Sequence, residues 1–318
     1  MIHLSKYEKR ILVKLAAEHG FIRETLEKVY RLVDILEYFY QNPFLKERLA
    51  LKGGTAINLH IFNLPRLSVD IDLDYCNPVA KNEMLKEREK INDDILTYLK
   101  RQGYSLSPKS KNYHSLDSYV FYYTNSAGNK DIIKIEINYS LRGHILPVKG
   151  TKIVTDILND KYTTTTLDPI EIFAGKINAL INRAAARDLY DINNMIYFGL
   201  FSQDDFVLLR KAVVFYRAIS SKDISTDIDF SNIDNISQYD IRTSLVPVLR
   251  RKDNFDLEIS KERVKEYLGN LLVLTEREMK FLDSFDNNLY CPELLFDDED
   301  IVKRIINHPM AIWKTMQR

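Results

Sequence analysis

The chain has 318 residues, 45% of them hydrophobic, and its 45 Lys and Arg residues balance its 45 Asp and Glu residues. This composition supports a folded core and excludes a bulk polycation, so nucleic acid would have to be bound by a local basic surface. The two cysteines, Cys76 and Cys291, are too few for a disulfide framework or a cysteine-rich zinc site. No segment reaches the roughly 20 apolar residues of a membrane helix, and we expect a soluble, intracellular protein.

Hydrophobic spacing predicts the elements of the first half of the chain. In residues 22–41, apolar side chains recur at spacings of three and four, which is typical of one face of a helix. In residues 68–75, Val69, Ile71 and Leu73 alternate with aspartates, which is typical of a strand. In chain order we predict helices at 5–19, 22–41 and 54–63, a strand at 68–75, a helix at 81–102, strands at 117–124 and 131–139 joined as a hairpin, and short strands near 151–157 and 162–166.

A different kind of region begins at Asp168. The sequence Asp168-Pro169-Ile170-Glu171 combines an acidic N-cap, a proline at the first helical position and a glutamate placed to close a capping box. It predicts a helix from 169 to about 184. Residues 200–318 are mostly helical in pattern, with a polar interruption at 220–238. We therefore predict an α+β protein, with a mixed sheet and flanking helices in a first domain (1–199) and a mostly helical second domain (200–318).

The strand at 68–75 carries the first candidate site residues. Because side chains alternate along a strand, Asp70 and Asp72 point to one side and Val69, Ile71 and Leu73 to the other. Two adjacent carboxylates repel each other, and a divalent cation between them relieves that repulsion. Oxygen ligands favour Mg²⁺, which completes its shell with water and substrate phosphates. The alternative is a solvated strand face, a description that also fits Asp74.

A glycine turn lies about 15 residues before the aspartates. Gly53 and Gly54 would let the backbone approach a phosphate closely, and the following helix would offer free N–H groups. Thr55 could add a hydroxyl donor. Alone this could be a simple turn, but together with the aspartates it predicts a site that holds the phosphates of a nucleotide and their metal ion.

A third carboxylate follows in the strand at 131–139. Glu136 would face the same side as Lys134 and Asn138. On a strand adjacent to Asp70 and Asp72 it could be a further metal ligand or a general base for an attacking hydroxyl. The alternative is a half-exposed strand residue.

The helix after Asp168 supplies cations. On one continuous helix, Lys176, Arg183 and Arg187 would share a face with Asp191 nearby. Such cations could bind the β- and γ-phosphates and neutralise charge on the leaving group, with Asp191 or Asp188 holding the lysine or meeting the metal. The alternative is an ordinary charged helix face with internal salt bridges.

These motifs, in this order and at these intervals, resemble the AbiEii/MenT-type nucleotidyltransferase toxins. The resemblance covers residues 48–76, with the glycine turn and the Arg66-x-Ser68-x-Asp70-x-Asp72 pattern, and residues 168–195. It implies a DNA polymerase β-like nucleotidyltransferase core with a helical C-terminal region. It also implies an NTP substrate, Mg²⁺ (or Mn²⁺), and a bacterial, cytoplasmic type IV toxin–antitoxin pair with a cognate antitoxin, often linked to abortive infection.

The resemblance also assigns roles to residues. Asp70 and Asp72 would be the metal ligands and catalytic carboxylates. Gly53, Gly54 and Ser68 would lie at the nucleotide phosphates, and Lys176 would contact phosphate. Asp191 would be the further catalytic acid. The roles of Thr55, Arg183 and Glu136 are predicted from the residue patterns alone.

The acceptor is left open by the sequence. Some members of the resembling family transfer nucleotides to the 3′ end of tRNA, which blocks translation, and we expect an RNA acceptor here. The alternatives are nucleotidylation of a protein or small-molecule hydroxyl, and NTP binding without turnover. The basic residues that could contact RNA are Lys109, Lys111, Arg142, Lys149, Arg210, Lys211, Arg250, Arg251 and Lys252.

Overall fold

The computed structural model describes residues 8–155, 157–158, 162–221 and 224–316. The chain forms two compact units. Unit 1 lies within Met1–Arg142, Val148–Thr166 and Val248–Lys252, and unit 2 lies within Gly143–Pro147, Leu167–Pro247 and Asp253–Arg318. This division differs from the boundary predicted after residue 199, because α6 (Pro169–Arg183) and α7 (Ala186–Tyr197) pack against the later helices α8 (Gln203–Ser220) and α10 (Leu257–Leu271).

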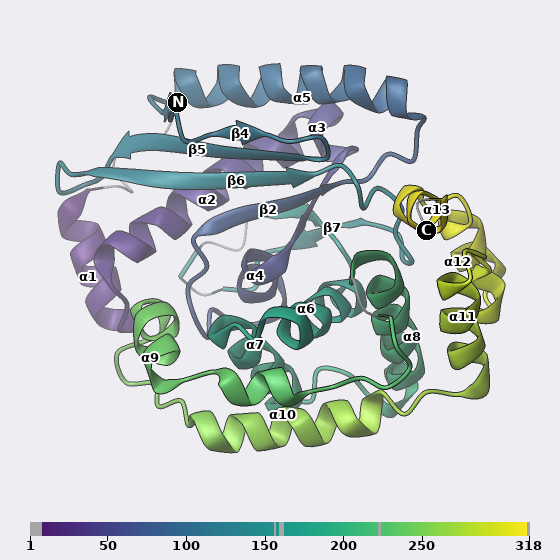
Figure 1. The fold of residues 1–318 in the computed structure, drawn as a ribbon. Helices are drawn as coiled ribbons and strands as arrows, with labels where there is room; N and C mark the ends of the chain where they lie inside the picture. The colour runs from purple at the N-terminus through teal and green to yellow at the C-terminus, as the bar shows by residue number, and fades with distance from the viewer. Residues whose placement is uncertain (1–7, 156, 159–161, 222–223, 317–318) are drawn as a thin grey trace. The chain divides into compact units, whose positions relative to one another are not determined.

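Unit 1 is built on one mixed sheet, drawn with its helices in Figure 1. Within the described residues the strand order is β3-β5-β6-β2-β1-β8-β7, with β4 paired to β5. The pairs β2–β6 and β1–β8 are parallel, whereas β1–β2, β5–β6 and β7–β8 are antiparallel. The strands are β1 (Leu49–Lys52), β2 (Asp70–Tyr75), β3 (Ser105–Leu106), β4 (Lys111–Asn112), β5 (Leu116–Thr124), β6 (Lys130–Asn138), β7 (Lys149–Lys152) and β8 (Thr163–Thr166).

The long helices α2 (Arg23–Gln41) and α5 (Lys81–Arg101) cover the apolar face of this sheet. Ile71, Leu73, Ile135 and Ile137 are almost completely buried there, as the alternation of apolar residues predicts. The covering helices meet each other through stacked rings of Tyr38 and Tyr98, whose centroids are 3.6 Å apart. The helical elements of unit 1 are α1 (Lys9–His19), α2 (Arg23–Gln41), α3 (Pro43–Lys46), α4 (Gly53–Ala56), the π-helical turn η2 (Ile57–Ile61) and α5 (Lys81–Arg101).

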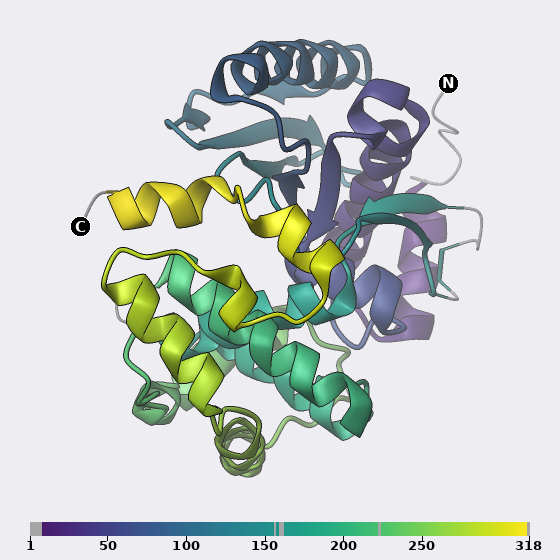
Figure 2. The same ribbon diagram turned by 90° about the vertical axis from the view of Figure 1, so that its right-hand side faces the viewer.

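Unit 2 is helical. Its helix α8 has α6, α11 and α13 against it, and these helices can be followed in Figure 2. Within the polar interruption predicted at 220–238, the described residues from 224 to 237 form only the short helical turn η3 (Ser231–Asn235). Residues 222 and 223 lie outside the described residues. The later elements are α9 (Gln238–Asp240), η4 (Ile241–Leu245), η5 (Val246–Val248), α11 (Glu276–Asp286), η6 (Pro292–Leu294), α12 (Glu299–Ile305) and α13 (Pro309–Met316).

The predicted α+β class with a mixed sheet is confirmed, and most predicted elements are present with ends shifted by one or two residues. Three predictions need correction or restriction. The helix predicted at 54–63 is a short α-helix followed by a π-helical turn. The strand predicted near 151–157 is β7, which ends at Lys152, and residue 156 lies outside the described residues. Residues 5–7 of the first predicted helix also lie outside them.

Candidate active site

The candidate carboxylates lie on the polar face of the sheet in unit 1. Asp70 is paired with Lys134 and Asp72 with Glu136 on the parallel neighbour β6. On its other side, Asp72 is paired with Lys52 of β1. Because directly paired residues project to the same face, the carboxylates of Asp70, Asp72 and Glu136 share this face with two lysines. The predicted placement of Glu136 on a strand adjacent to the two aspartates is therefore confirmed.

Glu136 is held by neighbours on both sides. Its Oε1 accepts a hydrogen bond from the Ser118 hydroxyl at 2.9 Å, and its Oε2 lies 2.9 Å from the Lys134 Nζ. Burial opposes the charged form of Lys134, but the hydrogen bond to Glu136 and the charges of Glu136, Asp70 and Asp72 raise the pKa of this lysine above its ordinary value. A protonated lysine thus lies among the candidate ligands, and Ser118 and Lys134 together orient the Glu136 carboxylate.

Asp74 differs from its neighbours on the strand. It is only 2% exposed, and its Oδ1 lies 2.5 Å from the Lys52 Nζ. The description of Asp74 as part of a solvated strand face is therefore wrong. Its carboxylate is committed to an internal ion pair beside the glycine turn, which agrees with its place outside the family motif.

The glycine turn is required by the protein's own packing. Gly53 has φ +68°, and a Cβ there would lie 2.8 Å from the Asp72 Oδ2. A Cβ on Gly54 would lie 2.6 Å from the Arg66 Nη2 and 3.0 Å from the Ser68 Oγ. The missing side chains therefore leave room for Asp72, Ser68 and Arg66 to approach the turn, in addition to any space they leave for a phosphate.

Thr55 links this turn to the strand of aspartates. It is 1% exposed, and its hydroxyl donates to the Asp70 carbonyl and lies 2.9 Å from the Ser68 Oγ. The predicted contact of this hydroxyl with a nucleotide would have to compete with these internal bonds. The structure thus gives Thr55 a supporting position beneath Ser68, which the family motif places at the phosphates, and Asp70, which the motif makes a metal ligand.

The remaining candidates form a compact ionic cluster in unit 2. Lys176 Nζ lies 2.6 Å from Asp188 Oδ1 and 3.0 Å from Asp191 Oδ2. Arg183 binds the other oxygen of Asp188, with Nε at 2.9 Å and Nη2 at 2.8 Å. Both aspartates are 1% exposed, whereas the Arg183 side chain is 65% exposed. The sequence predicted this grouping but gave no sign that the two carboxylates are buried.

The cluster forms across a break in the helix, not along one helix. Ala184 adopts a left-handed conformation with φ +49°, and α7 begins afresh at Ala186. The prediction of one continuous face is therefore wrong. The turn places Asp188 and Asp191 of α7 against Lys176 of α6, and it directs the Arg187 Nε to the Ser244 carbonyl at 2.8 Å.

The carboxylates of unit 1 suit a magnesium ion in their chemistry. Asp70 and Asp72 offer two hard oxygen donors on one face, and Gly53 leaves the space that the Asp72 carboxylate uses. Among the described residues no group of three or more Asp, Glu, His and Cys side chains is arranged to hold a metal ion. A two-carboxylate site fits an ion that takes its other ligands from water and a nucleotide, as Mg²⁺ does.

The basic residues proposed for RNA contact do not share one environment. Arg210 is paired with Glu278 and Lys211 with Asp297 in unit 2. Arg142 is partly buried, which lowers the pKa of its guanidinium. Lys109, Lys111, Lys149, Arg251 and Lys252 are exposed, and Arg250 donates to the carbonyls of Asn63 and Leu64. Several of the nine cations are thus already engaged within the protein.

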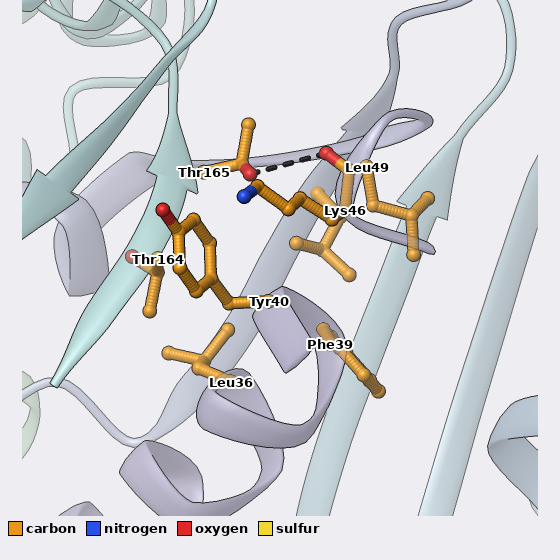
Figure 3. A pocket seen from close by; sticks show the side chains of 8 residues that line it. Leu36, Phe39, Tyr40, Lys46, Leu49, Thr164 and Thr165 are labelled. Carbon is orange, nitrogen blue, oxygen red and sulfur yellow. Dashed lines mark hydrogen bonds between the residues drawn. The ribbon is translucent and has the colours of Figure 1, made fainter. Parts of the chain in front are cut away.

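A small cavity in unit 1 is lined by residues of α2, α3 and the strands β1, β2 and β8. Its volume is about 10 Å³, and Figure 3 shows Tyr40 and Lys46 beside Thr165, whose hydroxyl donates to the Lys46 carbonyl at 3.1 Å. The lining also includes Leu36, Phe39, Leu49, Leu73 and Thr164. This volume is about that of one water and far below the hundreds of Å³ of a small-molecule site. The cavity is therefore no nucleotide pocket.

Sequence reasoning missed several residues around the site. Lys134 was placed correctly on the strand face of Glu136, but its ion pair with Glu136 was not predicted. Lys52 and Ser118 depend on strand register, which no local pattern reveals. Arg66 belongs to the family motif, but its sequence context predicted no role for it. In the structure its side chain is almost fully buried beneath Gly54.

Comparison with known proteins identifies the class. The model of the nucleotidyl transferase AbiEii toxin family, type IV toxin–antitoxin system, matches residues 34–287. The match spans both the aspartates of unit 1 and the Lys176 cluster of unit 2, and the chain belongs to this family of nucleotidyltransferase toxins.

The fold agrees with a solved structure of that class. MenT4, a nucleotidyltransferase toxin from Mycobacterium tuberculosis H37Rv, aligns with a TM-score of 0.62 and 15% sequence identity, covering 95% of this chain and 98% of that one. A search of curated protein sequences found no match. Within the described residues, no helix has the length and apolar character needed to cross a membrane.

Proposed function

We propose that this protein transfers a nucleoside monophosphate from an NTP to an RNA acceptor, the 3′ end of tRNA being the expected one. The observation that carries the proposal is the pair Asp70 and Asp72, which share one sheet face beside a glycine turn shaped to admit the Asp72 carboxylate. The family membership of the chain supports nucleotide transfer.

In the proposed reaction, the acceptor hydroxyl oxygen bonds to the α-phosphorus in line while the bond from that phosphorus to the β-phosphate breaks. Pyrophosphate leaves, and the hydroxyl proton passes to a carboxylate. Bound Mg²⁺ would supply charge neutralisation at the reacting phosphate. Asp70 and Asp72 would hold it, with Mn²⁺ as a substitute. Glu136 would act as a further ligand or as the base, oriented by Ser118 and Lys134.

We assign the residues of unit 2 to the leaving group and its support. Lys176 would contact phosphate, and Arg183, which keeps most of its side chain exposed, would assist. Asp191 would be the further catalytic acid. Gly53, Gly54 and Ser68 would lie at the phosphates, with Thr55 beneath them. The ion pairs of Lys176 with Asp188 and Asp191 support this by fixing the ammonium group in one place.

In the cell we propose a toxin of the bacterial cytoplasm that blocks translation and is restrained by a cognate antitoxin from the same operon, in a setting of abortive infection. The ion pairs of Arg210 and Lys211 with acidic side chains favour a second candidate acceptor class, because they reduce the positive charge available to bind RNA. That class is a protein or small-molecule hydroxyl.

The test is incubation of the purified protein with each labelled NTP, Mg²⁺ and total RNA, followed by separation of RNA, protein and small molecules. Label at RNA 3′ ends is the expected result, and label in another fraction would replace the acceptor. Asp70→Ala should abolish transfer and cellular toxicity, whereas Asp93→Ala on the exposed face of α5 should preserve both. No label in any fraction with any NTP would overturn the proposed enzyme and favour binding without turnover.

A further inference from the structure

Arg66 is an unusual residue to find in the interior of unit 1. It is 1% exposed and is among the largest of the almost completely buried side chains of the described residues. Burying a guanidinium is costly unless its donors are satisfied and its charge is compensated. The buried guanidinium lies directly beneath the glycine turn, and Arg66 is two residues before Ser68 in the sequence.

The backbone around Arg66 is fixed from two sides. Its amide lies 3.3 Å from the Asn58 Oδ1, and it forms an antiparallel bridge with Leu249. The next amide, that of Leu67, donates to the Val248 carbonyl at 2.8 Å. A segment from the later part of the chain thus returns to unit 1 and clamps the stretch that leads into Ser68 and Asp70.

The side chain of Arg66 takes the place that a side chain at residue 54 would occupy. Its Nη1 donates to the Leu67 carbonyl at 3.0 Å, and its Nη2 lies 2.6 Å from the position of a Cβ on Gly54. Asn58, which is fully buried, donates to the Gly54 carbonyl at 2.7 Å. Through Arg66 and Asn58, the glycine turn and the segment before Ser68 become one rigid piece.

We propose that Arg66 is a positioning residue for the triphosphate of the nucleotide. It sets the Gly53–Gly54 turn and Ser68 relative to each other and places a fixed positive charge beneath the turn. This inference rests on the proposed function only for the identity of the ligand, since the contacts that join Arg66 to the turn lie within the protein itself. Asn58 supports the same arrangement from the opposite side.

The first test uses Arg66→Met, which keeps the aliphatic part of the side chain but removes the guanidinium group and its charge. Arg66→Lys restores the charge, and Arg101→Met, at an exposed position of α5, is the control. Arg66→Met is expected to raise the KM for NTP about tenfold while kcat stays within about threefold, and Arg66→Lys should recover part of the loss. Amide hydrogen exchange without nucleotide should rise at residues 53–58 and 66–70 and stay unchanged elsewhere. An unchanged KM with unchanged exchange would overturn the inference, as would a uniform loss of protection across unit 1.

The second test is a double-mutant cycle. Gly54→Ala should weaken NTP binding because its Cβ meets the Arg66 Nη2, and Arg66→Met empties that position. The double variant should therefore bind NTP no more weakly than Gly54→Ala alone. Independent, multiplying losses would contradict a direct coupling of the two residues. The NTP binding of the second test and the hydrogen exchange of the first need no acceptor. If RNA transfer fails, these two readouts still decide the inference, and the dissociation constant for Mg²⁺–NTP then takes the place of KM.

Discussion

Acidic residues occur in two contrasting settings in this protein. In unit 1, Asp70, Asp72 and Glu136 are partly exposed on one sheet face, with Lys134 and Lys52 at the edges. In unit 2, Asp188 and Asp191 are almost completely buried and bind Lys176, with Arg183 adding two further contacts to Asp188. The first group has more acids than cations, whereas the second has two acids and two cations and is balanced.

The contrast separates binding from structural support. A partly exposed face with more acids than cations gains little stability from its carboxylates, because like charges repel each other and water solvates them. A buried, balanced cluster is sensitive to loss of either partner, because an uncompensated charge then remains in the interior. We therefore expect substitutions in unit 1 to reduce activity with little effect on stability, and substitutions of the buried acids in unit 2 to reduce stability as well.

The largest expected effect is on catalysis in unit 1. Asp72→Asn should lower transfer by more than about a hundredfold, because even residues that only support metal ligands cost about 10- to 100-fold. Its melting temperature should stay the same or rise, since one of several clustered carboxylates becomes neutral. The measurements are single-turnover transfer and thermal denaturation, with Asp93→Asn as the control. A folded, fully active Asp72→Asn protein would remove this residue from the site.

The next effect should appear as stability in unit 2. Asp188→Ala removes the shared partner of Lys176 and Arg183, and breaking a buried pair in this way typically costs about 3–5 kcal/mol. Denaturant unfolding measures the free energy, and Asp204→Ala on the exposed first turn of α8 is the matched control. A loss of unfolding free energy below about 1 kcal/mol would show that the cluster stabilises the protein no more than a surface ion pair does. The buried acids of unit 2 would then not differ in stabilising effect from the exposed acids of unit 1.

The sequence was sufficient for the long elements and for the face that carries the chemistry, but not for the short strands β1, β3 and β4. Alternation placed Asp70, Asp72 and Glu136 correctly, because strand geometry depends only on neighbouring residues. The position of Asp74 was misjudged because its burial depends on Lys52, which comes from another strand. Whether a carboxylate is solvated or paired is a property of the packed protein and not of its strand.

The ionic cluster of unit 2 also depends on packing that the sequence did not reveal. The end of this helix near residue 184 was predicted correctly, but Lys176, Arg183 and Arg187 were still placed on one continuous helix face. Alanine is the best helix former, so nothing local predicted a left-handed residue at Ala184. Tertiary packing of α7 against α10 overrides that preference. The same residues were nevertheless grouped correctly, because Lys176, Asp188 and Asp191 are recognisable as a motif whatever the path of the chain between them.

A third prediction concerns acid sensitivity within unit 1. His60 is buried in the π-helical turn, with Nδ1 donating to the Lys152 carbonyl and Nε2 accepting from Thr164. Burial lowers the pKa of His60 to about 4, although the carbonyl bond opposes this shift. The folded state thus favours the neutral ring, so stability is complete above the ordinary pKa of 6.5 and is lost as the pH falls through 6.5 towards 4.

This loss should approach about 3 kcal/mol at pH 4, since each pKa unit corresponds to about 1.4 kcal/mol. Urea unfolding between pH 7 and 4 measures it. His60→Gln, whose amide can bond to both partners without titrating, should flatten the profile, and the exposed His114→Gln should leave it unchanged. An equal slope in wild type and His60→Gln would assign the acid sensitivity to other groups.

The smallest expected effect tests the charge balance of the unit 1 face directly. Lys134 carries a positive charge beside Glu136, Asp70 and Asp72, and it therefore opposes binding of a divalent cation there. Lys134→Met should tighten the binding of Mn²⁺ by about threefold to tenfold, the effect of one unit charge at a few ångströms in a partly hydrated setting. Titration followed by Mn²⁺ electron paramagnetic resonance, without nucleotide, measures this affinity. Lys134→Arg should bind Mn²⁺ as the wild type does, and Lys86→Met on α5 controls for net charge. If all four proteins bind Mn²⁺ equally, Lys134 does not face the ion, and the metal site must lie beyond its reach on this sheet.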